Sequence, residues 1–228
     1  MQSDLGFFET IHHHWSGGGP WMYPIAIASI FAIAITIERY MYLFVRTRTN
    51  KERFVGELHK YVLAGDLQSA VSFVAGQKPT PLTNVVKAGL VKVRSSDAVV
   101  QSALDEATLR ELPKLERRTG YLSVIGNVAT LLGLLGTIGG LIQCFAAVSK
   151  PGADPTLKSA VLANGIAEAM NCTAFGLIVA IPSLIAFALL NGRTQQIVDE
   201  LHETAVSVMN LVVNNRDKLR ETREKARG

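Results

Sequence analysis

Three long apolar stretches constrain the fold of this chain more than any other feature. They lie at residues 21–45, 121–148 and 169–190 of the 228 residues. Each is long enough to cross the hydrocarbon core of a bilayer, which takes about 20 helical residues. The first stretch lacks the basic start, short apolar core and cleavage site of a signal peptide, so we interpret it as a retained span. The sequence therefore predicts an all-α membrane protein with three transmembrane helices.

Basic residues indicate how the chain is oriented in the membrane. Lys and Arg are absent from residues 1–22, gather near both ends of the segment 46–120, and return in the tail after residue 192. Because cytoplasmic loops are enriched in Lys and Arg, we expect the N-terminus outside and the C-terminus in the cytoplasm. This orientation also accounts for the net charge of +4, so the charge gives no reason to predict nucleic-acid binding.

Hydropathy and orientation together divide the chain into seven segments. These are a periplasmic amphipathic segment (1–20), a first span (21–45), a cytoplasmic helical domain (46–120), a second span (121–148), a periplasmic link (149–163), a third span (164–191) and a cytoplasmic helical tail (192–228). The apolar periodicity of the cytoplasmic domain predicts helices at 51–63, 67–74, 81–93 and 97–118. We expect the last helix to continue into the second span, with a kink at Pro113 or Gly120. The third span should continue into the tail, so that two spans extend into a cytoplasmic bundle.

Several polar residues have interpretations that involve no reaction chemistry. Cys144 and Cys172 are interpreted as packing residues, with a disulfide as the alternative. Adjacent Glu38 and Arg39 are explained by pairing with each other or by snorkelling. The consecutive histidines 12–14 would point in different directions on a helix, so we expect no metal site there. The sequence shows no P-loop, HExxH or nucleophile motif, and we expect no enzyme.

A stripe of small and weakly polar residues follows the second span, and the third span repeats it. Its members at helical spacing are Asn127, Thr130, Gly133, Gly136, Thr137 and Gly140, then Thr173 and Gly176. Small residues let helices approach closely in a bilayer, where no hydrophobic force separates protein from lipid. The threonine hydroxyls either bond to the preceding helical turn or line a polar path, and both interpretations stay open.

The cores of the second and third spans contain no Asp, Glu, Lys, Arg or His. An ion-driven membrane machine needs a group that charges and discharges inside the bilayer. Glu168 stands at the outer start of the third span, where we expect a carboxylate to gain from the helix N-terminus. A polar face without a carboxylate indicates that another polypeptide supplies the titrating group.

Two blocks of sequence carry a family resemblance. They are "NVATLLGLLGTIGGLIQCF" (127–145) and "LANGIAEAMNCTAFGLIVAIPSLIAFALLNGR" (162–193), with a weaker match at 18–40. In motif order and spacing the sequence resembles the MotA/TolQ/ExbB family of ion-driven motor proteins. Three spans with the N-terminus outside resemble its ExbB/TolQ branch, and a gliding-motor member is also open. Thr130 stands where the family usually has proline.

The resemblance implies a homopentamer around a pore that holds two copies of an ExbD/TolR-like single-span partner. The membrane Asp of that partner would carry the proton. Thr137 and Thr173 would meet this Asp, Glu168 would mark the pore mouth, and Pro182 would bend the third span. No cofactor is expected beyond the translocated H⁺, with Na⁺ as the alternative ion.

The implied function is that of a stator subunit in the bacterial cytoplasmic (inner) membrane, which converts proton motive force into mechanical work. The client would be a TonB/TolA-like protein or a gliding machinery, so transport energisation, envelope maintenance and gliding motility all stay open. A non-motor membrane scaffold or a passive ion channel is the alternative from a different class. Absence of a single-span partner with a membrane Asp would favour that alternative.

Overall fold

The protein is described from a computed structural model, which covers residues 20–47, 51–149 and 155–215. All regular structure in these ranges is helical. The elements are α2 (Met22–Tyr40), the π-helix η1 (Met41–Arg46), α3 (Lys51–Leu63), α4 (Leu67–Gly76), α5 (Pro81–Val91), α6 (Asp97–Glu116), α7 (Thr119–Val148) and α8 (Pro155–Asn214). The expected N-terminal amphipathic segment, its three histidines and the end of the tail lie outside the described residues.

The chain divides into two units, each described by itself. The membrane unit comprises Met1–Glu38 and Arg118–Leu189, and the bundle unit comprises Arg39–Arg117 and Leu190–Gly228. Three helical stretches, which contain α2, α7 and α8, are long and apolar enough to cross a membrane. The predicted all-helical protein with three candidate spans is thus confirmed.

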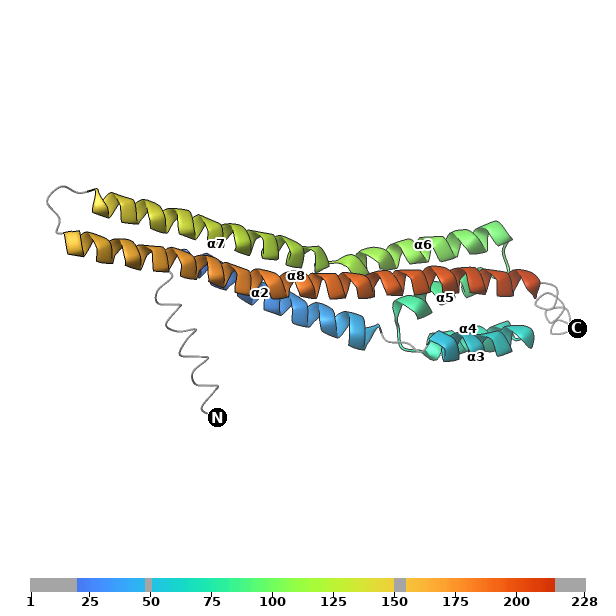
Figure 1. Ribbon diagram of the computed structural model, residues 1–228. Coiled ribbons are helices and arrows are strands. Elements are labelled where there is room, and N and C mark those ends of the chain that lie inside the picture. Colours follow the sequence, from blue (N-terminus) through green and yellow to red (C-terminus); the bar gives the residue numbers. More distant parts are fainter. Residues whose placement is uncertain (1–19, 48–50, 150–154, 216–228) are drawn as a thin grey trace, which may run out of the picture. The chain divides into compact units, whose positions relative to one another are not determined.

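In the membrane unit, α7 and α8 run side by side (Figure 1). Their shared core is small, because it contains Ala129 of α7 with Cys172 and Ala180 of α8. α2 contributes Ile25 to the same core, and Trp21, just before α2, packs against it. Most large apolar side chains of the three helices are exposed in the single chain, as expected for surfaces that meet lipid or other subunits.

The boundary between α6 and α7 differs from the expectation. α6 ends at Glu116 and α7 begins at Thr119, so the helices are interrupted at residues 117–118. Arg118 has a φ of 64°, a left-handed conformation that cannot continue an α-helix. Pro113 lies inside α6 and Gly120 inside α7. The kink predicted at one of these two residues is therefore wrong, and the break follows from the backbone of Arg118.

The third span continues well beyond the membrane stretch, as predicted. α8 is a single helix of 60 residues from Pro155 to Asn214. Residues 155–163, which belong to the segment expected as a periplasmic link (149–163), are already helical. Pro155 suits the first helical position, since its ring fixes φ and its missing N–H is not needed there.

The bundle unit contains α3 to α6, in which each helix packs against the next in sequence. Leu58, Val85 and Leu104 are completely buried in its core. α5 and α6 approach closely at Gly89, where an added Cβ would lie 2.9 Å from Cγ of Leu104. The predicted ranges of α3 to α6 agree with the structure to within two residues at each end.

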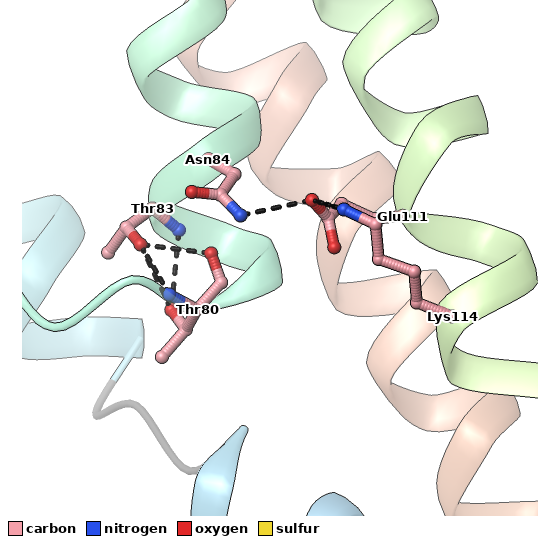
Figure 2. A network of polar contacts seen from close by, with 5 residues as sticks. All are labelled: Thr80, Thr83, Asn84, Glu111 and Lys114. Carbon is pink, nitrogen blue, oxygen red and sulfur yellow. Dashed lines mark hydrogen bonds and ion pairs between the residues drawn. The ribbon is translucent and has the colours of Figure 1, made fainter.

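Two N-caps fix the starts of helices in the bundle unit. Asp66 precedes α4 and accepts hydrogen bonds from the backbone N–H of Ser69 (3.0 Å) and from its hydroxyl (2.6 Å). These bonds favour the ionised carboxylate and lower the pKa of Asp66 below its usual value. Thr80 caps α5 in a reciprocal capping box with Thr83 (Figure 2).

Glu38 and Arg39 have partners other than those expected. In the membrane unit, both carboxylate oxygens of Glu38 accept from the guanidinium of Arg118, at 2.7 and 2.6 Å. In the bundle unit, the guanidinium of Arg39 donates to the carbonyls of Lys114 and Leu115 at the end of α6. Arg39 is only 3% exposed, so it does not snorkel to water. A cation at these carbonyls is favoured, because a helix C-terminus carries partial negative charge.

Candidate functional site

The glycines of the predicted stripe lie where α7 and α8 cross. A Cβ added to Gly176 would lie 2.7 Å from the carbonyl oxygen of Ala129 and 3.1 Å from Cα of Gly133. A Cβ added to Gly133 would lie 3.2 Å from Cα of Thr173. At this crossing the two helices are in backbone contact, and only glycine leaves room for it.

Two further glycines of α7 extend the contact toward the C-terminal end of α7. A Cβ on Gly140 would lie 3.2 Å from Cβ of Ala169. Gly136 meets both α8 and the start of α2, since its Cβ would lie 2.9 Å from Cβ of Cys172 and 3.3 Å from that of Trp21. These glycines therefore set the spacing of all three membrane helices.

The three threonines of the predicted stripe bond in two different ways. Thr173 of α8 donates from Oγ1 to the carbonyl of Gly133 on α7, at 3.0 Å. Thr130 and Thr137 bond within α7, to the carbonyls of Gly126 (3.1 Å) and Leu134 (2.6 Å). The sequence predicts either a bond to the preceding helical turn or a polar path for these threonines. A bond between two spans is not among these interpretations. Thr173 thus ties α8 to α7 beside the glycine crossing.

Asn127, Thr130 and Thr137 lie on one side of α7. Together with Thr173 of α8, we call these residues the polar flank. At about 100° per residue the three α7 side chains fall within an arc of about 80°. Gly136 and Gly139, which meet Trp21, fall on the other flank. Asn127 and Thr130 are exposed in the single chain, and Thr137 and Thr173 are partly exposed. The polar flank is therefore turned away from α2.

Asn127 differs from the threonines because its carboxamide makes no hydrogen bond to another described residue. An unpaired amide in an apolar environment carries a desolvation cost of about 1–3 kcal/mol. A residue of this kind within a membrane span favours a position that faces water or a polar partner.

Glu168 lies apart from the polar flank. It precedes Thr173 by five residues of α8, which turns it about 140° around the helix. It also lies thirteen residues, about 20 Å, beyond the first residue of α8. The expected stabilisation of Glu168 by a helix N-terminus is therefore wrong, because helix-terminal effects fade within one turn.

Pro182 lies inside α8, which continues past it. The ring removes the N–H that would bond to the carbonyl of Ile178. Next to it, Ser183 donates to the carbonyl of Val179 at 2.7 Å. Pro182 lines a shallow apolar groove of about 340 Å³ between α8 and α2, with Thr36 of α2 on the other wall. This groove is on the side of α8 that meets α2.

The two cysteines and the other possible metal ligands do not form a disulfide or a metal site among the described residues. Cys144 and Cys172 are buried and both free, so the disulfide alternative is wrong. The described residues contain no group of three or more His, Cys, Asp or Glu that could hold a metal ion.

One polar network around a buried carboxylate is not predicted from the sequence. Glu111 of α6 is 5% exposed and accepts from Nδ2 of Asn84 on α5 (3.0 Å) and from Nζ of Lys114 (2.8 Å). Figure 2 shows these residues between the two helices. A signal was present, since Glu111 sits between Leu104 and Leu115 at helical spacing on the buried face of α6.

Comparison with known proteins identifies relatives of this chain. Residues 77–203 match the model of the MotA/TolQ/ExbB proton channel family. The chain is 30% identical over 191 residues to putative biopolymer transport protein ExbB-like 3 of Synechocystis, across 79% of this chain and 90% of that protein. It is 27% identical over 231 residues to biopolymer transport protein ExbB of Salmonella typhimurium, across 95% and 89%. The structure of C. jejuni MotAB has a similar fold, with a TM-score of 0.65 at 16% identity, across 89% of this chain and 82% of that one.

Proposed function

Since the chain belongs to the MotA/TolQ/ExbB proton channel family, we propose that it is the pore-forming stator subunit of a proton-driven motor in a bacterial inner membrane. The observation that carries the proposal is the polar flank on α7 and α8. It offers hydroxyl and amide groups at membrane depth, whereas residues 119–148 and 169–192 contain no Asp, Glu, Lys, Arg or His. The flank can solvate a proton carrier but cannot itself hold the transported charge.

Five copies of the chain would enclose a pore with their polar flanks turned inward. The partner in the pore would be two copies of an ExbD/TolR-like single-span protein with a membrane Asp. In this arrangement Thr137 and Thr173 meet the Asp, Asn127 and Thr130 line the cytoplasmic half, and Glu168 stands nearer the periplasmic mouth. The N-terminus is periplasmic and the C-terminus cytoplasmic, which agrees with the distribution of Lys and Arg.

The motor would use the passage of protons to move the pentamer relative to its partner. A proton entering from the periplasm neutralises one partner Asp, and its release to the cytoplasm restores the charge. The Asp then exchanges its contacts between successive subunits. One proton that crosses a potential of about 150 mV supplies roughly 3.5 kcal/mol, which is enough to bias such a step.

The names of the relatives support a role in energising transport. Both are called biopolymer transport proteins, so we propose a TonB/TolA-like client that carries the work toward the outer membrane. Envelope maintenance and gliding motility are the other processes that the same stator could drive.

The test is co-expression of the chain with single-span proteins encoded beside it, followed by proton flux in proteoliposomes. We expect a partner with one membrane Asp to co-purify, and flux to require that Asp. Thr173→Val should leave assembly intact and abolish flux and energised work. A complex that forms no proton path, or a chain that conducts equally well alone, would instead identify a scaffold or a passive channel.

A further inference from the structure

The stretch that forms α4, α5 and the turns beside them carries only positive charges. Residues 67–96, which we call the basic hairpin, contain no Asp or Glu but include Lys78, Lys87, Lys92 and Arg94. The helix that follows has the opposite balance, since residues 97–116 hold five acidic and two basic residues. Charge of one sign on a surface bears on association with other molecules rather than on the fold.

The fold does not use these four charges. All four side chains are exposed, and none forms an ion pair or a hydrogen bond with another described residue. On α6, by contrast, Arg110 pairs with Glu106. The acid just before the hairpin is also engaged, because the carboxylate of Asp66 is bonded to Ser69. The basic hairpin therefore presents its positive charge to its surroundings.

An apolar groove lies among these charges. It has a volume of about 270 Å³ and lies between α4 and α5, and its lining residues include Leu67, Val71, Leu90, Val91 and Arg94. Leu90 is buried in the groove, whereas Val91 is 58% exposed. Lys87 precedes Val91 by one helical turn, so it lies on the same side of α5. Apolar surface and positive charge are thus offered together.

We propose that the basic hairpin docks an acidic segment of another cytoplasmic protein, with one apolar side chain of that segment seated between α4 and α5. The inference rests on the proposed function only in placing the bundle unit in the cytoplasm. The groove is smaller than small-molecule pockets, which typically have about 300–1,000 Å³, so it suits a single large side chain. Carboxylates beside that side chain would pair with Lys87 and with Arg94, which can bind a carboxylate in bidentate fashion.

Two other anionic partners fit the groove less well. Single-stranded nucleic acid is held largely by aromatic side chains on which its bases stack. None of the described residues that line the groove is aromatic. A lipid surface attracts basic residues, but it is flat and offers no projecting side chain to fill a groove between two helices.

A second copy of this chain is disfavoured because its most acidic helix is already engaged. Asp105 of α6 accepts from Nε2 of Gln101 at 3.0 Å, and Glu106 accepts from the guanidinium of Arg110 at 2.6 Å. These acids would have to give up internal bonds before they could pair with the basic hairpin. A partner with free carboxylates does not meet this cost.

The consequence is a contact on the cytoplasmic side, separate from the partner in the membrane and from the client beyond it. The attraction is between exposed charges, so it should raise the association rate and select acidic partners. It should also weaken as salt is added, because salt screens exposed charges.

The first experiment captures the partner in cells. Photoreactive benzoylphenylalanine replaces Val91 in the full-length chain, and the cross-linked segment is identified by mass spectrometry. We expect a segment of another protein that is rich in Asp and Glu. Arg94→Glu should abolish the cross-link, whereas Lys60→Glu should leave it unchanged. Lys60 is the matched control, since it is an exposed lysine on α3 that does not line the groove.

The second experiment measures how the captured segment, made as a synthetic peptide, binds to the purified full-length chain. Arg94→Glu should weaken binding about tenfold or more, and an acid-to-Lys change in the peptide should restore binding to that variant. For the unchanged chain, binding should weaken when KCl is raised from about 0.05 M to about 0.5 M. Equal thermal midpoints for the chains with and without Arg94→Glu check that the variant is folded.

Three results would overturn the inference. The first is a cross-link from position 91 that ends on lipid, nucleic acid or a second copy of this chain. The second is no cross-link at all, and the third is a cross-link or a peptide affinity that Arg94→Glu leaves unchanged. Failure of the proposed function would look different, because it concerns the membrane Asp of the partner and proton flux, and capture at position 91 requires neither.

Discussion

Gly176 and Gly133 meet backbone to backbone at the crossing of α8 and α7. A side chain on Gly176 would reach within 3.1 Å of Cα of Gly133 and 2.7 Å of the carbonyl oxygen of Ala129. These neighbours are main-chain atoms, which cannot move aside as a flexible side chain can. The crossing brings Oγ1 of Thr173 to the carbonyl of Gly133, so helix packing and the placement of the polar flank depend on the same contact.

We expect Gly176→Ala to destabilise the protein by about 1–3 kcal/mol, because overpacking at a fixed backbone contact forces the helices apart. Gly192→Ala is the matched control on the same helix, since an added Cβ there meets nothing within 4 Å. It should be neutral or slightly stabilising, because alanine has the higher helix propensity. Thermal unfolding in detergent compares the two variants. Equal midpoints would show that the crossing is looser than described.

The sequence predicts the helices well, because the signals for them are local. Apolar length identifies the spans, and the period of apolar residues locates α3 to α6. The glycine stripe also follows from spacing alone. The sequence does not predict which residues of one membrane helix contact which residues of another. The bond from Thr173 to Gly133 joins residues 40 positions apart, so no local pattern contains it.

The errors have a common physical origin. Proline and glycine are the usual helix breakers, so the sequence favours a kink at Pro113 or Gly120, yet Arg118 adopts the left-handed backbone. The sequence predicts that Arg39 pairs with Glu38 or reaches water, because long cations at span ends often snorkel. Its actual partners are carbonyls that belong to α6 and are about 75 residues distant in sequence. Tertiary contacts override the local preference at both positions.

We expect Glu111→Ala to destabilise the bundle unit by about 0.5–1.5 kcal/mol, since it removes the acceptor of the hydrogen bond from the exposed amide of Asn84. The double variant with Asn84→Ala should lose less than the sum of the two single changes, because the amide is then absent. Chemical unfolding of all three variants completes the cycle. Additive losses would show that Asn84 and Glu111 do not interact.

We expect Arg39→Gln to cost about 1.5–3 kcal/mol, because hydrogen bonds from a charged donor at a buried helix C-terminus are lost. Arg53→Gln is the control, since its ion pair with Glu57 is exposed and should change stability by less than about 0.5 kcal/mol. The measurement is the midpoint of unfolding in detergent. Similar shifts in both variants would remove the capping role assigned to Arg39.

The N-cap of α4 predicts a pH dependence of local stability. The pKa of Asp66 is lowered in the folded chain, so the unfolded chain binds the proton more readily. The cap therefore stabilises fully above the usual Asp pKa and is lost as pH falls through the folded value. Asp66→Asn should raise the hydrogen-exchange rate of the Ser69 amide near neutral pH. The difference from the unchanged chain should shrink toward acid, and a difference that grows there would contradict the sign.

A change at Asn127 distinguishes an effect on the fold from an effect on the proposed ion path. Its carboxamide has no hydrogen bond to another described residue and is exposed on the polar flank, so the single chain loses no contact when it is removed. Asn127→Leu should therefore leave the unfolding midpoint and the yield of the complex nearly unchanged, within about 0.5 kcal/mol. If the flank lines a hydrated pore, the same change replaces a polar wall by an apolar one and should reduce proton flux at least tenfold. Val128→Leu, one residue further along α7 and on the neighbouring face, is the matched control and should leave flux unaltered. Full flux in Asn127→Leu together with a higher unfolding midpoint would place Asn127 against lipid, and the polar flank would then not line the path.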